Sequence, residues 1–78
     1  MIDLIAKEAS VTELAKDMDV DAILADMQAN TREVDATDFI RAMIRIFGYT
    51  FEYARSLVYG LIELGRAVLT DRYTLRLS

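Results

Sequence analysis

The feature that most limits the folds open to this chain is residues 38–69, which are apolar on almost every side when placed on helices. Between residues 38 and 47 the polar side chains are Asp38, Arg41 and Arg45, and they fall on one narrow stripe at i, i+3 and i+7. A helix that is hydrophobic nearly all round is one that is buried on several sides. Residues 38–47 therefore predict a helix enclosed by other elements.

Residues 51–69 show the same excess of apolar surface. At about 100° per residue the polar side chains share one sector with Tyr59, and apolar residues cover the larger remaining arc. A surface helix needs an apolar stripe only somewhat wider than about 100°. The pattern predicts the longest helix of the chain, about 51–69, with two packing surfaces. The second surface is filled either by the chain's own N-terminal helices or by another chain, such as a second copy.

Helix start and stop signals divide the whole chain into helices. Ser10–Glu13 has the form of a capping box, and Asp19 is the next N-cap candidate. Thr37 and Asp38 are positioned to cap the helix that Gly48 ends, and Thr50 caps the long helix that follows. The signals predict one all-α domain over residues 1–78, a small bundle of four to five helices. Residues 31–36 are interpreted as a connection, and the alternating tail at residues 72–78 as either a helix extension or a short strand.

Composition narrows the classes of function. The chain has 78 residues and neither Cys nor His, which excludes disulfides and thiolate sites and removes the commonest metal ligand and general base. We therefore expect no enzyme, no metal site, no cofactor and no small-molecule substrate. A domain this small has thin stability, and oligomerisation or partner binding remains as the way to increase it. The acidic N-terminus and the short apolar runs predict a cytoplasmic protein without signal peptide or membrane span.

Charge is divided unevenly along the chain. Residues 1–40 carry three basic and ten acidic side chains, whereas residues 41–78 carry six basic and three acidic ones. This division suits docking of the two halves, head-to-tail contacts between copies, or an acidic face that attracts a basic partner. It equally suits acidic side chains that are simply solvated at helix N-termini.

Three local motifs were tested against known functional patterns. Asp17–Asp21 resembles the start of a calcium loop, but Ala22 and Gln28 stand where the EF-hand needs Gly and Glu. The turn at residues 47–55 resembles the Gly-aromatic corner of ubiquitin-associated-type domains over too little of the chain to imply a function. Residues 12–24 have the rhythm of a helix-turn-helix, although acids occupy the positions that would face phosphates.

The chemistry of the long helix supplies the candidate binding residues. Ser56, Gly60 and Ala67 would allow close approach of another helix, and tyrosines are favoured at interfaces because their rings carry a polar tip. The sequence thus predicts a small acidic protein-binding module, an inhibitor, regulator or adaptor that is homodimeric and would suit a phage or mobile element. The alternative is a helix-turn-helix transcriptional regulator bound to nucleic acid. The predicted partner-binding residues are Tyr53, Ser56, Leu57, Tyr59, Gly60, Leu64 and Ala67.

Overall fold

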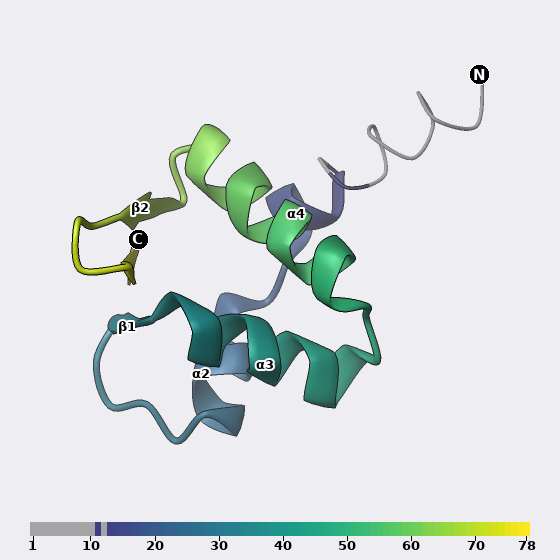
Figure 1. Ribbon diagram of the computed structural model, residues 1–78, viewed down its shortest axis with the longest axis horizontal. Coiled ribbons are helices and arrows are strands. Elements are labelled where there is room, and N and C mark those ends of the chain that lie inside the picture. The colour runs from purple at the N-terminus through teal and green to yellow at the C-terminus, as the bar shows by residue number, and fades with distance from the viewer. Residues whose placement is uncertain (1–10, 12) are drawn as a thin grey trace.

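Helices and a small sheet together build this domain. The computed structural model describes residue 11 and residues 13–78, of which residues 11 and 13–17 form the N-terminal helical segment. Figure 1 shows the elements that follow it. They are α2 (Val20–Asp26), β1 (Glu33–Asp35), α3 (Ala36–Phe47), α4 (Phe51–Glu63), β2 (Ala67–Leu69) and β3 (Thr74–Leu77). The prediction of an all-α helical bundle is wrong, because three strands pair into a sheet.

The sheet has the order β1-β3-β2 with both pairings antiparallel, so the last strand in sequence is the central one. Leu75 and Leu77 of β3 are buried, whereas Arg76 between them is exposed. This is the two-residue period of a strand with one face on the core. Of the two predictions for the tail, the strand is the correct one, since β1 and β2 supply the pairing edges.

The helix predicted over about 51–69 ends early. α4 is the longest helix of this part of the chain, but it stops at Glu63 and residues 67–69 are strand β2. Gly65 adopts a φ of +77°, a left-handed conformation that glycine tolerates and that ends a helix. The Arg66 amide then donates to the Leu61 carbonyl at 2.8 Å, which closes the helix end. The helix predicted over about 51–69 would continue through Gly65, whereas the left-handed conformation of Gly65 ends it.

Most of the predicted helix caps are confirmed. The side chain of Asp19 accepts from the Ala22 amide, and that of Thr50 accepts from the Tyr53 amide. Gly48 ends α3 with a φ of +71°. The N-cap of α3 is Asp35 rather than Thr37 or Asp38, because the preceding strand leads directly into the helix. The predicted capping box at Ser10–Glu13 lies partly outside the described residues.

One hydrophobic core lies between the helices and the inner face of the sheet. The largest side chains within it are almost completely inaccessible to solvent. Each of α2, α3, α4 and β3 contributes to it, so the core joins both halves of the chain. The members of this set are Phe39, Ile23, Ile40, Met43, Leu57, Leu61 and Leu75.

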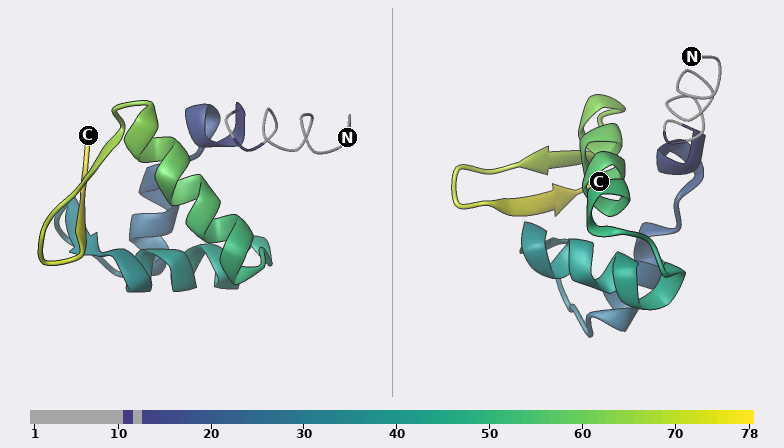
Figure 2. Two further views of the ribbon diagram at one scale, coloured as in Figure 1. Left: turned by 45° about the horizontal axis from the view of Figure 1, so that its top comes forward. Right: turned by 45° about the vertical axis from the view of Figure 1, so that its right-hand side comes forward.

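Two helices joined by a short turn lead directly into the β2–β3 hairpin. Helix α3, a turn at residues 48–50 and helix α4 are followed by the β2–β3 hairpin, and β1 precedes them as the third strand. Figure 2 shows the hairpin extending away from the end of α4. The described part of the segment at residues 12–24, which has the rhythm of a helix-turn-helix, forms two helices separated by residues 18–19.

Candidate protein-binding surfaces

Of the close-approach edge predicted at Ser56, Gly60 and Ala67, only Gly60 contacts another helix closely, and that helix belongs to the chain itself. A Cβ added at Gly60 would lie 2.9 Å from the Ala15 Cβ, so the N-terminal helical segment packs directly against the α4 backbone. Arg66 holds the end of this segment, because its guanidinium donates to the carbonyls of Ala15, Lys16 and Met18 at 2.7, 2.9 and 3.1 Å. One of the two predicted packing surfaces of α4 is therefore internal.

Three of the predicted partner-binding residues turn inward. Leu57 and Ala67 are 0% and 2% exposed, so they belong to the core and offer no surface to a partner. Gly60 faces the N-terminal helical segment. These three residues are therefore not part of a candidate binding surface, because each of them packs against other residues of the same chain.

The other predicted residues remain accessible. Tyr59 and Leu64 are 56% and 41% exposed, and Ser56 is exposed with its hydroxyl donating to the Glu52 carbonyl at 2.9 Å. Tyr53 is half-buried at the first turn of α4. The predicted binding residues that stay accessible thus lie in two places. Ser56, Tyr59 and Leu64 lie on the exposed side and at the end of α4, and Tyr53 lies at the corner where α3 meets α4.

That corner gathers the densest aromatic surface among the described residues. The aromatic corner, as we name it, consists of Phe47, Tyr49, Phe51 and Tyr53. Phe47 stacks on Tyr49 with ring centroids 5.2 Å apart, and Tyr49 meets Tyr53 edge-on at 4.8 Å. Phe47 and Phe51 nevertheless remain 42% and 51% exposed. Neighbouring Ile46 is exposed as well, which extends the apolar surface.

Burial acts on Tyr53 electrostatically as well as by packing. Partial removal from water raises the pKa of its phenol above the usual 10.0, and the nearby Tyr49 raises it further. A tyrosine hydroxyl is already protonated at neutral pH and can donate a hydrogen bond, and the raised pKa extends this to more alkaline pH. A ring packed on its neighbour with a neutral polar tip is the kind of group favoured in protein interfaces.

Only Tyr53 of this corner was among the predicted binding residues. Phe47 and Phe51 lay in the apolar arcs of their helices and were assigned to burial. Both lie beside the turn that begins at Gly48, where they stay exposed although Tyr49 stacks on Phe47. The signal available in the sequence was the crowding of four aromatic rings around one short turn.

The exposed side of α4, which we call its outer stripe, is slightly acidic. Its exposed charged side chains are Glu52, Arg55 and Glu63. Nucleic-acid affinity depends mainly on cations that neutralise phosphates. This stripe supplies one cation against two anions, so its charge does not favour phosphate.

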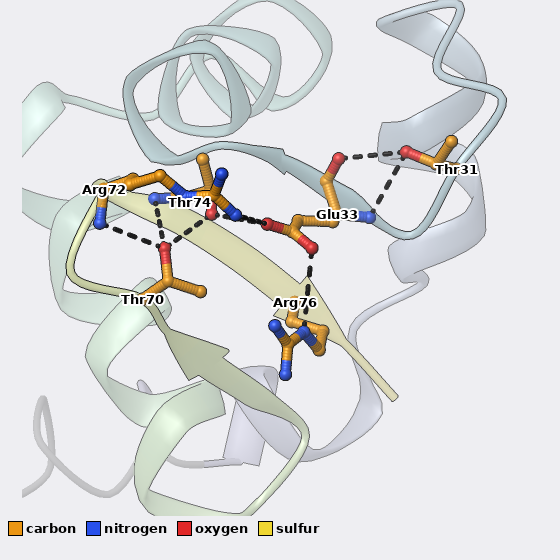
Figure 3. A network of polar contacts seen from close by, with 6 residues as sticks. All are labelled: Thr31, Glu33, Thr70, Arg72, Thr74 and Arg76. Carbon is orange, nitrogen blue, oxygen red and sulfur yellow. Dashed lines mark hydrogen bonds and ion pairs between the residues drawn. The ribbon is translucent and has the colours of Figure 1, made fainter.

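The hairpin arginines are already engaged by a carboxylate. Glu33 of β1 lies 3.3 Å from Arg72 and 3.7 Å from Arg76, and its Oε2 accepts from Thr74 at 3.0 Å (Figure 3). Thr74 in turn shares a 2.6 Å hydrogen bond with Thr70. Both arginines are largely exposed, so the pairs themselves stabilise little. The carboxylate of Glu33 still offsets the positive charge of these two arginines. A phosphate backbone near the hairpin would therefore be attracted less strongly.

Residue 11 and residues 13–78 contain no group of three or more acidic side chains arranged to hold a metal ion. Nor do they include a helix with the length and apolar character that a membrane crossing requires. No family model, no curated protein and no solved structure matches this chain. The geometry of the chain itself therefore carries the functional argument.

Proposed function

We propose that this chain is a small acidic protein-binding module that acts as a regulator, inhibitor or adaptor by covering a surface of its partner. The observation that carries the proposal is the aromatic corner, where Phe47, stacked on Tyr49, and Phe51 stay exposed. Large aromatic side chains that are held in place before binding supply much of the energy of protein interfaces. The proposal includes no catalytic step and places the protein in the cytoplasm.

Charge supports a protein partner for this corner. Of the charged side chains at residues 45–53, Arg45 is paired with Asp26 at 2.7 Å, and Glu52 is acidic. Single-stranded nucleic acid also stacks on aromatic rings, but it binds where a positively charged groove follows its backbone. Within residues 45–53 the one basic side chain is paired with a carboxylate, so we infer a partner with an apolar pocket or ridge.

The test is a quantitative capture experiment with matched variants. Phe47→Ser and Phe51→Ser, separately and combined, should reduce capture of a specific host protein at least tenfold, while far-UV circular dichroism stays unchanged. Leu14→Ser is the control, because Leu14 is 41% exposed, close to the 42% of Phe47, but lies on the N-terminal helical segment. Equal capture by the corner variants and the wild type would contradict the proposal. So would loss of capture in the Leu14 variant alone.

A second candidate function is nucleic-acid binding as a transcriptional regulator, and one observation favours it. The connectivity α3–turn–α4–hairpin is an arrangement that places a helix and a hairpin side by side on DNA. Fold alone does not determine function, however, and the charges of α4 oppose this use. Retention on DNA that weakens with salt, and that Arg55→Glu abolishes, would support it. Absence of retention at low salt would exclude it.

A further inference from the structure

Helix α4 packs against the rest of the described chain on two of its sides. One side enters the hydrophobic core, and a second meets Ala15 of the N-terminal helical segment at Gly60. The remaining side is the outer stripe, where Tyr59 is 56% exposed. An aromatic ring that is carried on a regular helix and left in water is the kind of group that interfaces use. A partner of the outer stripe has to match the charges that surround this ring.

Two opposite charges lie symmetrically about Tyr59. Arg55 stands four residues before it and Glu63 four residues after it, and both side chains are exposed. At about 100° per residue they fall on opposite flanks of the stripe, and each lies about 6 Å along the helix from Tyr59. Neither takes part in an ion pair with another described residue. Within the described part of the chain, both charges are therefore available to another molecule.

A twofold axis at Tyr59 makes this pattern complementary to itself. When α4 of a second copy lies antiparallel across the stripe, a residue before Tyr59 faces the residue that lies equally far after Tyr59 in the other copy. Arg55 of each copy then faces Glu63 of the other. Three residues from the axis, Ser56 faces Ile62 in the same way. The serine is small and exposed, so it leaves room for the half-buried Ile62 side chain.

We propose that a second copy of this chain covers the outer stripe, with the two α4 helices antiparallel and Tyr59 at the twofold axis. The two copies make each opposite-charge pair twice. A parallel arrangement would instead bring Arg55 against Arg55 and Glu63 against Glu63. Charge pairs of this kind fix orientation and register, because the wrong arrangement sets like charges together. A twofold contact also closes on itself, so the assembly ends as a dimer.

The size of the surface sets the strength of this dimer. α4 has 13 residues and is about 20 Å long. One pair of such helices buries less area than the roughly 1,600 Å² of a standard interface. We therefore expect a weak dimer with a Kd on the order of 0.1 mM. The inference does not rest on the aromatic corner, because neither Phe47 nor Phe51 takes part in the contacts that define the register.

Charge reversal tests the register, because two disruptive variants should rescue each other. Arg55→Glu and Glu63→Arg each set like charges opposite one another twice, so each alone should dimerise at least about tenfold more weakly in sedimentation equilibrium. Mixed in equal amounts they should form a heterodimer as tight as the wild-type dimer, since every pair then joins opposite charges. Arg41→Glu is the control, because it makes the same charge change at an exposed position of α3. That variant should dimerise like the wild type.

Two results would overturn the inference. One is a wild type that stays monomeric up to about 1 mM, ten times the expected Kd. The other is a mixture of Arg55→Glu and Glu63→Arg that associates no better than either variant alone. Far-UV circular dichroism of each variant verifies that it is folded, as expected for changes at exposed positions.

A single cysteine gives an independent measurement, because the chain has none of its own. Tyr59→Cys places two thiols at the twofold axis, so it should form a disulfide-linked dimer at least about tenfold faster than Val68→Cys on mild oxidation. The two sites are matched, since Tyr59 and Val68 are 56% and 54% exposed. Equal rates would indicate chance collision and would contradict the proposal. None of these results bears on capture by the aromatic corner, so the two proposals fail separately.

Discussion

Tyr73 sits at the tip of the β2–β3 hairpin in a backbone conformation that its side chain disfavours. Its φ is +60°, and its amide donates to the Thr70 carbonyl at 3.1 Å. Hairpins with three-residue loops place a left-handed residue at this position, and glycine is the usual choice. A bulky side chain there costs about 1–2 kcal/mol relative to a relaxed conformation. The ring is 48% exposed, so packing does not offset this strain.

We expect Tyr73→Gly to stabilise the protein by roughly 1 kcal/mol, which corresponds to a thermal midpoint about 4–8 °C higher. Arg72→Gly is the matched control, because Arg72 lies in the same loop without a positive φ. There glycine only adds freedom to the unfolded chain, so that variant should lose stability. A lower midpoint for Tyr73→Gly would mean that the ring contributes more than its exposure indicates.

The raised pKa of Tyr53 links stability to alkaline pH. The folded state holds the phenol proton more tightly than the unfolded chain does, chiefly because of burial and secondly because of Tyr49. Its stabilising contribution is therefore complete below pH 10.0 and is lost as the pH rises through the folded-state pKa. Urea midpoints of Tyr53→Phe should decline less than those of the wild type between about pH 9 and 11.5. Parallel declines would assign the alkaline loss to other groups.

At the scale of elements, the helix boundaries that depend on local chemistry were predictable. The helix caps Asp19, Gly48 and Thr50 depend only on the backbone of neighbouring residues. A short stretch of sequence is therefore enough to predict them. The strands depend on residues far apart in the chain. Val34 pairs with Leu75, and neither three-residue β1 nor the alternating tail reveals the other. Strand pairing across such a separation leaves almost no local signal.

Gly60 tests the contact between α4 and the N-terminal helical segment. Alanine would gain about 1 kcal/mol in helix propensity, but its Cβ would stand 2.9 Å from that of Ala15. Overpacking in a tight contact costs about 1–3 kcal/mol, so we expect a net loss of stability on urea unfolding. Combining Gly60→Ala with Ala15→Gly moves the methyl group to the other helix. The pair should therefore be more stable than the sum of the single changes predicts.

At the scale of the whole molecule, the candidate site was only partly predictable. The predicted binding residues that stay accessible include Tyr53, Tyr59 and Leu64. Leu57 and Ala67 are instead buried in the core. A helical projection shows which residues share a face, but not which other element covers that face. The early end of α4 moved Ala67 from a helix surface to a strand, and the exposure of Phe47 depends on how α3 and α4 meet.

The central strand makes the stability of the whole domain depend on its last residues. Leu75 is fully buried and belongs to the strand that joins both others. Leu75→Ala should cost about 2–5 kcal/mol. That is comparable to the total stability of a domain of this size, so circular dichroism should show largely unfolded protein. Arg76→Ala, at the adjacent exposed position, should change stability by less than about 0.5 kcal/mol.

Because β3 lies between β1 and β2, neither of these strands has a partner in the sheet without it. Release of the four residues Thr74–Leu77 would therefore remove all strand pairing among the described residues at once. A protease that cuts the loop between β2 and β3 should leave the sheet intact only for as long as β3 stays bound noncovalently.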